Sequence, residues 1–337
     1  MVVIQVIGNR PAVGKTCLIA ALLNELTNDG KSGCYYKPFS RTPEHDLDTE
    51  FISQVLLPES SVPPHPQAYP PDAATSPPKD VRETISTLAD TFDVVLVEGP
   101  DQGPEMEVGA SISPNYLSEL DSKILLIYRY ETGLEASAVA AAAQSLGSNL
   151  SGVVINGFVR HRQRSVCEGI VSDLKANGVP VLGALPEDRT MLSVTVQQVA
   201  EHLGGRWLHP PADPEVWIDR FLIGGNIMDS GPNYFGRYCH QAVITRAERP
   251  DIQMASLASD TRCLVLTGGS EPTEYIQVEA TNKDVPIILV DGDTLNTLDS
   301  LAGILERANP YALHKVQRFS ELMENYLDTP ALRALLA

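Results

Sequence analysis

The amino-acid sequence predicts an α/β protein with a doubly wound, mostly parallel sheet in its first two-thirds and a second, smaller α/β unit in the remainder. Short apolar runs alternate with helical patterns from the N-terminus to about residue 187, which is typical of strands covered by helices on both faces. A glycine-rich stretch separates the first apolar run from the first helical pattern. After residue 211 the alternation begins again with a new pattern, which predicts the second unit.

The pattern assigns each element in turn. In the first domain, strands are expected at residues 1–8, 33–39, 93–100, 123–130, 150–158 and 179–187, and helices at 15–30, 46–57, 134–147 and 164–178. In the second domain, strands are expected at 241–247, 263–269 and 285–293, and helices at 251–259, 271–282 and 293–307. The tail at 310–337 has an amphipathic helical pattern. In an open parallel sheet, ligands bind at the carboxyl ends of the strands.

Two domains are expected, 1–210 and 211–337, with the boundary near Pro211. Residues 58–78 contain eight prolines and are expected to form an extended surface loop inside the first domain. This loop could bind a partner, but a plain connection is the favoured interpretation. Neither domain contains an internal repeat.

Charge and cysteine content exclude several classes of protein. The net charge of −18 argues against nonspecific binding to nucleic acid or to an anionic membrane, because those surfaces would repel the chain. The five cysteines show no CxxC spacing, which favours a reduced, cytoplasmic protein over a disulfide framework or a zinc site. No apolar run has the length needed to span a bilayer.

Residues 8–16, Gly-Asn-Arg-Pro-Ala-Val-Gly-Lys-Thr, indicate a phosphate-binding loop between a strand and a helix. Such a loop points backbone N–H groups at phosphate oxygens, while its lysine meets phosphate charge and its hydroxyl holds Mg²⁺. Lys15 and Thr16 fit those roles, and an ordinary helix start is the alternative. The predicted nucleotide-contacting residues of the loop are Gly8, Arg10, Val13, Gly14, Lys15, Thr16 and Cys17. Gly8 stands one residue further from Gly14 than the general pattern requires.

That longer spacing resembles the loop of the dethiobiotin synthetase family, and five later segments are similar to that family in the same order. They are YYKPFS, DLDTEF, VVLVEGP, GVVINGF and VPVLGALPED. The resemblance implies ATP and Mg²⁺ as ligands. It places Lys37 beside the reacting groups as a catalytic residue together with Lys15, and Gly99 beside the phosphates. It also implies metal binding by Thr16, Asp48 and Glu98, with Asp46 as the alternative to Asp48, and adenine contact by Asn156, for which a turn role is nearly as good.

The substrate half of that family's site is replaced. Pro11 and Ala12 stand where the family has Thr and Glu, and the segments 39–41 and 100–102 also depart from its pattern. Arg10 lies where the related MinD and ParA ATPases carry a lysine that reaches across a dimer. A surface arginine is the favoured interpretation, but the resemblance implies a homodimer through the first domain.

Residues 215–306 resemble the DRTGG domain, carried by ITRAERPDIQMASL, CLVLTGG and VPIILVDGDT. A P-loop domain of this kind followed by a DRTGG domain resembles the N-terminal half of large phosphotransacetylases, without the acetyl-transferring domain. Gly268 and Gly269 either cradle an anion or make a tight turn. For His240 a structural role is favoured over acid–base chemistry, and for Asp291 and Asp293 helix capping is favoured over cation binding.

The sequence therefore predicts an ATP- and Mg²⁺-binding regulatory or scaffold protein whose DRTGG-like unit senses a ligand or binds a partner, such as a separate acetyltransferase. An ATP-dependent ligase that phosphorylates a carboxylate or carbamate is the alternative, with Lys15 and Lys37 acting on the transferred phosphoryl group. A third possibility is a remnant loop that no longer binds nucleotide. Neither nucleic acid nor membrane is expected as a partner.

Overall fold

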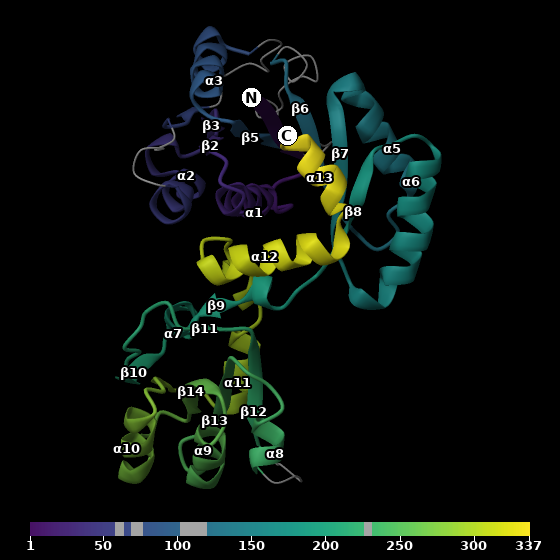
Figure 1. The fold of residues 1–337 in the computed structure, drawn as a ribbon. Helices are drawn as coiled ribbons and strands as arrows, with labels where there is room; N and C mark the ends of the chain where they lie inside the picture. The colour runs from purple at the N-terminus through teal and green to yellow at the C-terminus, as the bar shows by residue number, and fades with distance from the viewer. Residues whose placement is uncertain (58–63, 69–76, 102–119, 226–230) are drawn as a thin grey trace. The chain divides into compact units, whose positions relative to one another are not determined.

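The computed structural model describes residues 1–57, 64–68, 77–101, 120–225 and 231–337 (Figure 1). These residues form two compact units, one made of residues 1–188 with 310–337 and the other of residues 189–309. Most of the proline-rich loop expected at 58–78 lies outside the described residues, as does Gln102 of the altered substrate half. In the described part of the chain, no helix is long and apolar enough to cross a bilayer.

The first unit is built on a six-stranded parallel sheet with the strand order β2-β5-β1-β6-β7-β8. Its strands are β1 (Val2–Gly8), β2 (Gly33–Tyr36), β5 (Val94–Asp101), β6 (Lys123–Arg129), β7 (Leu150–Phe158) and β8 (Val181–Pro186). The order reverses at β1, so the carboxyl ends of β1 and β5 form the crevice where a doubly wound sheet binds ligands. The fold class and all six predicted strands are confirmed.

Helices cover this sheet. One face of the sheet packs on α3 (Lys79–Thr91), α5 (Ala136–Ser145) and α6 (Ser172–Ala176). The core between them includes Val95, Ile124 and Val153. A π-helical turn at Ser165–Val171 precedes α6. Helix α1 (Lys15–Asn28) follows the glycine-rich loop. Helix α2 (Leu47–Phe51) continues into a π-helical turn, Ile52–Leu56. The two-residue strands β3 (Phe39–Ser40), before α2 in the sequence, and β4 (Gln67–Ala68), after it, pair with each other in parallel.

The tail packs on the first unit rather than the second, which differs from the expected division of the chain. Helices α12 (Leu313–Tyr326) and α13 (Thr329–Leu335) contact β8, and α12 also packs on α1. The apolar stripe of α12, made of Val316, Phe319, Leu322 and Met323, is buried. An amphipathic pattern shows that one helix face is buried but does not identify its partner, so the sequence could not assign the tail.

The second unit contains a five-stranded sheet with the order β10-β15-β14-β13-β12. Strands β12 (Arg220–Gly224), β13 (Gln241–Arg246), β14 (Thr261–Thr267) and β15 (Ile287–Val290) are parallel, and β10 (Arg206–His209) pairs antiparallel with β15. Because β10 belongs to this sheet, the second unit begins well before the expected boundary at residue 211. A small sheet of β9 (Val194–Thr195) and β11 (Trp217–Ile218) accompanies it.

The helices of the second unit are α7 (Val196–Leu203), α8 (Gly231–Phe235), α9 (Pro250–Leu257), α10 (Glu274–Asn282) and α11 (Thr294–Ser300). The three strands and three helices predicted for this unit are confirmed. One apolar cluster includes residues of α7 and the other residues of α9 and α10, and each takes alternate residues of the central strands. The second domain is therefore a separate α/β layer structure with its own core.

Candidate functional site

The glycine-rich loop between β1 and α1 has a backbone that requires its glycine. Gly14 precedes α1 with φ of 102°, a left-handed conformation that side chains rarely adopt. A Cβ atom on Gly14 would lie 2.8 Å from Nδ2 of Asn156, and that amide donates a hydrogen bond of 2.7 Å to the carbonyl of Val13. Asn156, at the carboxyl end of β7, therefore supports the loop directly, and its predicted adenine contact stays a prediction.

The loop is also fixed on its outer side. Asn9 accepts a hydrogen bond of 2.9 Å from the backbone N–H of Arg129, at the end of β6. Arg10 forms an ion pair with Glu131, and both side chains are partly exposed. Arg10 therefore pairs with a residue of its own chain, just after β6, and this ion pair connects the loop to that segment. Its role across a dimer stays a prediction.

Thr16 and Glu98 meet at the centre of the site. Thr16 is the second residue of α1, and Glu98 lies near the end of β5, next to β1. The Thr16 hydroxyl lies 3.3 and 3.4 Å from the two carboxylate oxygens of Glu98, and the Tyr35 hydroxyl donates to Glu98 at 2.9 Å. Gly99 allows β5 to approach β1, because a Cβ atom there would lie 2.6 Å from the Ile7 side chain. Strand β5 thereby brings a buried carboxylate against the loop helix.

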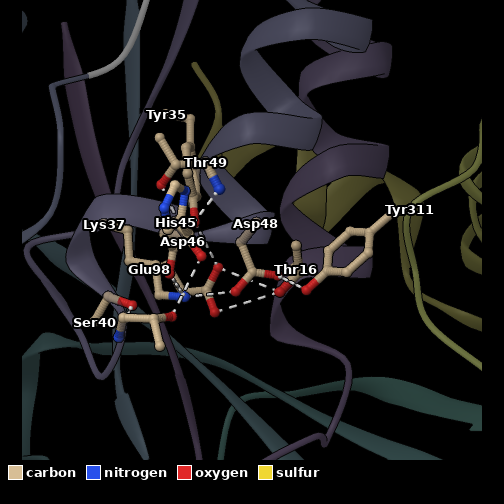
Figure 2. Close-up of polar contacts among 11 residues, drawn as sticks. Thr16, Tyr35, Lys37, Ser40, His45, Asp46, Asp48, Thr49, Glu98 and Tyr311 are labelled. Atoms are coloured by element: carbon tan, nitrogen blue, oxygen red, sulfur yellow. Dashed lines mark hydrogen bonds and ion pairs between the residues drawn. The ribbon is translucent and has the colours of Figure 1, made fainter. Parts of the chain in front are cut away.

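Lys37 lies between two aspartates that surround the start of α2 (Figure 2). Its ammonium group is 2.7 Å from Oδ2 of Asp46 and 2.5 Å from Oδ2 of Asp48. Asp46 caps α2, since its other oxygen accepts from the backbone N–H and hydroxyl of Thr49, both at 2.9 Å. The other oxygen of Asp48 accepts a hydrogen bond of 3.2 Å from the Tyr311 hydroxyl. Lys37 is therefore held by two carboxylates in the resting site.

Burial and mutual charge control the protonation of these groups. Burial, reinforced by the negative charge of Asp48, raises the pKa of Glu98 to about 7, although Lys15 and Lys37 oppose the rise. Burial alone would lower the pKa of Lys37, but the Glu98 and Asp48 carboxylates hold it above its usual range. Burial opposes ionisation of Asp46, yet its hydrogen bond from Lys37 keeps its pKa below the usual value. Near neutral pH, Glu98 is therefore about half protonated, while Lys37 stays charged.

Cys17 follows Thr16 on α1, and α12 supplies a lysine near it. Burial raises the pKa of the Cys17 thiol to about 12, which keeps it a neutral thiol despite the opposing charge of Lys315. Burial also lowers the pKa of Lys315 to about 8. These values describe an unreactive thiol. The predicted contact of Cys17 with nucleotide therefore concerns its backbone N–H group and stays a prediction.

The donor set fits Mg²⁺. Octahedral Mg²⁺ takes oxygen ligands at about 2.1 Å, so neighbouring ligands stand roughly 3 Å apart, close to the separation of the Thr16 and Glu98 oxygens. Among the described residues, no three His, Cys, Asp or Glu side chains gather as a metal site. Mg²⁺ does not require three, because it is usually held by one or two carboxylates with waters and phosphates. A cation here would also offset the buried charge of Glu98.

The polar residues singled out in the second unit serve the fold. The backbone N–H of Gly268 donates to the Gly292 carbonyl at 2.9 Å, and that of Gly269 donates to Val290 at 3.0 Å. These N–H groups therefore join the end of β14 to the end of β15, and their hydrogen bonds are used within the fold. Asp293 caps α11 by accepting from Asn296 N–H at 2.8 Å, and the His240 ring stacks on Trp217 with centroids 4.0 Å apart. The capping role of Asp293 is confirmed, and the structural role of His240 stays a prediction that the stacking supports.

Two tyrosines of the site were not predicted. Tyr35 lies on β2 between apolar residues, and Tyr311 is 263 residues away from its partner Asp48. Asp46 was predicted only as the alternative to Asp48, and the structure places both on Lys37. The one local signal was the Asp-Leu-Asp-Thr sequence, in which the first aspartate stands three residues before the threonine whose N–H it accepts.

Comparisons with known proteins agree with this architecture. A family model described as an AAA domain matches residues 3–194, and a DRTGG domain model matches residues 198–304. The chain is 24% identical over 280 residues to a phosphate acetyltransferase of Nitratidesulfovibrio vulgaris, and the match covers 76% of this chain and 39% of that protein. The chain therefore spans about two-fifths of the length of this curated relative.

Partial matches to solved structures were also found. MinD of Aquifex aeolicus is 17% identical with a TM-score of 0.39, and the match covers 57% of this chain and 84% of that chain. The CBS and DRTGG domains of a Clostridium perfringens pyrophosphatase, complexed with diadenosine tetraphosphate, are 9% identical with a TM-score of 0.29, covering 42% of this chain and 71% of that chain. The first family match covers more than half of the chain, so this protein belongs to that AAA-domain family of P-loop proteins, with a DRTGG domain after its nucleotide-binding domain.

Proposed function

We propose that this protein is a regulatory protein that binds ATP with Mg²⁺ through its first unit. The observation that carries this proposal is the Thr16–Glu98 pair, a hydroxyl and a buried carboxylate 3.3 to 3.4 Å apart behind a phosphate loop. Burying a carboxylate without a full partner is costly, and a bound cation would relieve that cost. Mg²⁺ would neutralise phosphate charge there, with Thr16 and Glu98 as ligands and Asp48 close to them.

The position of Lys37 favours binding over group transfer. A lysine that stabilises a transferring phosphoryl group must present its charge to that group. Here Asp46 and Asp48 both hold the Lys37 ammonium, at 2.7 and 2.5 Å, so the aspartates already neutralise its charge. Lys15, within the loop itself, lies near enough to Glu98 to lower the pKa of that carboxyl group. These contacts support nucleotide binding with slow turnover at most.

The partner class follows from the similarity to phosphate acetyltransferase. The match covers 39% of that protein, so its whole activity is not assigned to this chain, and a phosphate acetyltransferase is proposed as the partner. The DRTGG domain would bind a small ligand or the partner. Nucleotide binding to the first unit would change the affinity of the DRTGG domain for that ligand or partner. The predicted homodimer and cytoplasmic location belong to the same proposal.

Calorimetric titration with ATP and MgCl₂ tests the proposal. The wild type should bind, and Lys15→Ala should lose at least about a hundredfold in affinity, because it removes a charge-assisted phosphate contact from a preformed loop. Lys175→Ala, at an exposed lysine of α6, is the matched control and should bind as the wild type does. Absence of binding by the wild type would contradict the proposal and support a remnant loop.

The ligase alternative predicts a different dependence on Lys37. If the protein phosphorylates a carboxylate or carbamate, Lys37→Ala should abolish ADP release in the presence of the amine substrate. Under the regulatory proposal, ADP release stays slow in both proteins and Lys37→Ala changes mainly the affinity for Mg²⁺. Enzyme-like ATP turnover coupled to amide or ring formation would overturn the regulatory proposal.

A further inference from the structure

The segment that follows the DRTGG unit supplies a residue to the nucleotide site. The chain leaves the second unit after Asn309 and re-enters the first unit at Pro310. Tyr311, the next residue, donates its hydroxyl to Oδ1 of Asp48 at 3.2 Å and packs its ring against Phe51, with centroids 5.7 Å apart. Figure 2 shows Asp48 and Thr16 between Tyr311 and Lys37. Tyr311 therefore contacts the site from a segment that lies outside the phosphate-loop motif and far from it in the sequence.

The position of Tyr311 is fixed by the helices behind it. Arg318 of α12 forms an ion pair of 2.7 Å with Asp188, which is 9% exposed. Arg333 of α13 pairs with Glu25 of α1 at 3.1 Å. Lysines of the P-loop unit, Lys31 and Lys123, donate to the carbonyls of Leu336 and Leu335 at 2.9 Å. The tail is thus attached to the first unit at several points, and Tyr311 lies two residues before the attached helix α12.

Asp48 is held at both of its oxygens by different segments. Oδ2 accepts from Lys37 at 2.5 Å, and Oδ1 accepts from Tyr311. A carboxylate with one donor can rotate about its terminal bond, whereas donors at both oxygens fix its plane. Asp48 is the second residue of α2, a helix of five residues, and its side chain is 16% exposed. Its orientation toward Thr16 and Glu98 therefore depends on these external donors.

We propose that Tyr311 is a positioning residue for Asp48 and that the nucleotide site is completed only when the segment after the DRTGG unit is docked on the first unit. Tyr311 acts through Asp48 and does not itself contact nucleotide. The part of this inference that concerns Mg²⁺ rests on the proposed function. The part that concerns the orientation of Asp48 does not, so the two can fail separately.

Hydrogen exchange without nucleotide tests the link between Tyr311 and Asp48. Tyr311→Phe keeps the ring on Phe51 and removes only the hydroxyl, and it should speed exchange of the α2 amides about threefold or more. Asp48→Asn should act similarly, and the double variant should exchange no faster than the faster single variant, because the Tyr311 hydroxyl acts through the Asp48 carboxylate that Asp48→Asn already removes. Tyr326→Phe, at a partly buried tyrosine on α12, is the matched control. Rates that multiply in the double variant would overturn the inference.

Mg²⁺ titration at fixed ATP tests the consequence for the site. Tyr311→Phe should raise the Mg²⁺ concentration at half-saturation about three- to tenfold, the range expected for one hydrogen bond to a charged group. Its affinity for ATP in EDTA should match the wild type. An equal loss with and without Mg²⁺ would show a general structural defect and overturn the positioning role. If the wild type binds no nucleotide, the proposed function fails, and the exchange experiment still decides whether Tyr311 positions Asp48.

Discussion

The two units of this protein share an architecture but differ in what they bury. Both contain parallel strands whose carboxyl ends carry polar residues. Within the described residues, the buried charged side chains are Asp46, Glu98, Asp188 and Lys315, and all four belong to the first unit. The buried polar side chains of the second unit are hydroxyls and amides, such as Thr267 and Gln253. Both sheets have a carboxyl edge at which ligands could bind. The buried charged side chains favour the edge of the first unit as the ligand site.

This difference has a physical reason. A hydroxyl can be buried at little cost when it finds a partner, as Thr245 does by donating to the carbonyl of Gly224 at 2.7 Å. A carboxylate is costly to bury even when hydrogen-bonded. Glu98 accepts from Tyr35, yet its pKa remains raised to about 7. The first unit therefore contains a buried carboxylate whose ionisation is unfavourable and which a bound cation can stabilise, whereas the described residues of the second unit contain no buried carboxylate.

The largest expected effect is on the pH dependence of the first unit. The pKa of Glu98 is about 7 in the folded protein against an ordinary value of 4.5, so the folded state binds the proton more tightly. Without Mg²⁺, stability should fall as pH rises from about 4.5 to 7, by up to about 3 kcal/mol. Glu98→Gln should remove this slope and stabilise the first unit at pH 8, measured by denaturant unfolding. A steeper slope in the variant would contradict the origin assigned to it.

A second prediction compares a glycine from each unit. Gly14 and Gly268 have φ of 102° and 94°, so alanine strains both by about 1–2 kcal/mol. A Cβ atom on Gly14 would also meet Asn156 at 2.8 Å, whereas on Gly268 the nearest atom, in Glu248, is 4.0 Å away. Gly14→Ala should therefore cost more stability and abolish nucleotide binding, while Gly268→Ala leaves binding unchanged. Equal loss of binding in both variants would remove the distinction between the units.

The smallest effect concerns one ion pair from each unit. Arg318 holds the buried carboxylate of Asp188 at 2.7 Å, whereas Arg262 and Asp260 form an exposed pair at 3.0 Å in the second unit. Arg318→Ala should cost about 1–2 kcal/mol, because it leaves a buried charge with a weaker partner. Arg262→Ala should cost less than about 0.5 kcal/mol. Chemical denaturation of both variants measures the difference, and costs of equal size would argue that burial of charge has no special weight here.

Much of the fold could be predicted because its strands are apolar runs of simple composition. All six strands of the first sheet follow from that signal. Strands β10 and β12 were missed, since Arg-Trp-Leu-His and Arg-Phe-Leu-Ile-Gly are short and mixed in polarity. The tail was placed in the wrong unit, because its apolar stripe is completed by α1, whose sequence lies almost 300 residues earlier.

The site was predictable where chemistry follows a motif and hidden where it depends on long-range packing. The loop spacing and the resemblance brought together Lys15, Thr16, Lys37, Asp48 and Glu98, and the structure places these residues near one another. Their partners Tyr35 and Tyr311 have no local pattern that marks them as donors. The pairing of Lys37 with Asp46 and Asp48 depends on the position of α2 relative to Lys37, which the spacing of these residues in the sequence does not predict.

Hydrogen exchange of the whole protein with and without ATP and Mg²⁺ tests the central claim most directly. The account predicts that nucleotide protects the phosphate loop, the first turn of α1 and the α2 segment, while the turn at Gly268 and Gly269 exchanges as before. Lys15→Ala should show no such protection. Protection confined to the second unit, or none in the wild type at saturating nucleotide, would contradict the claim that the buried charges of the first unit form the nucleotide site.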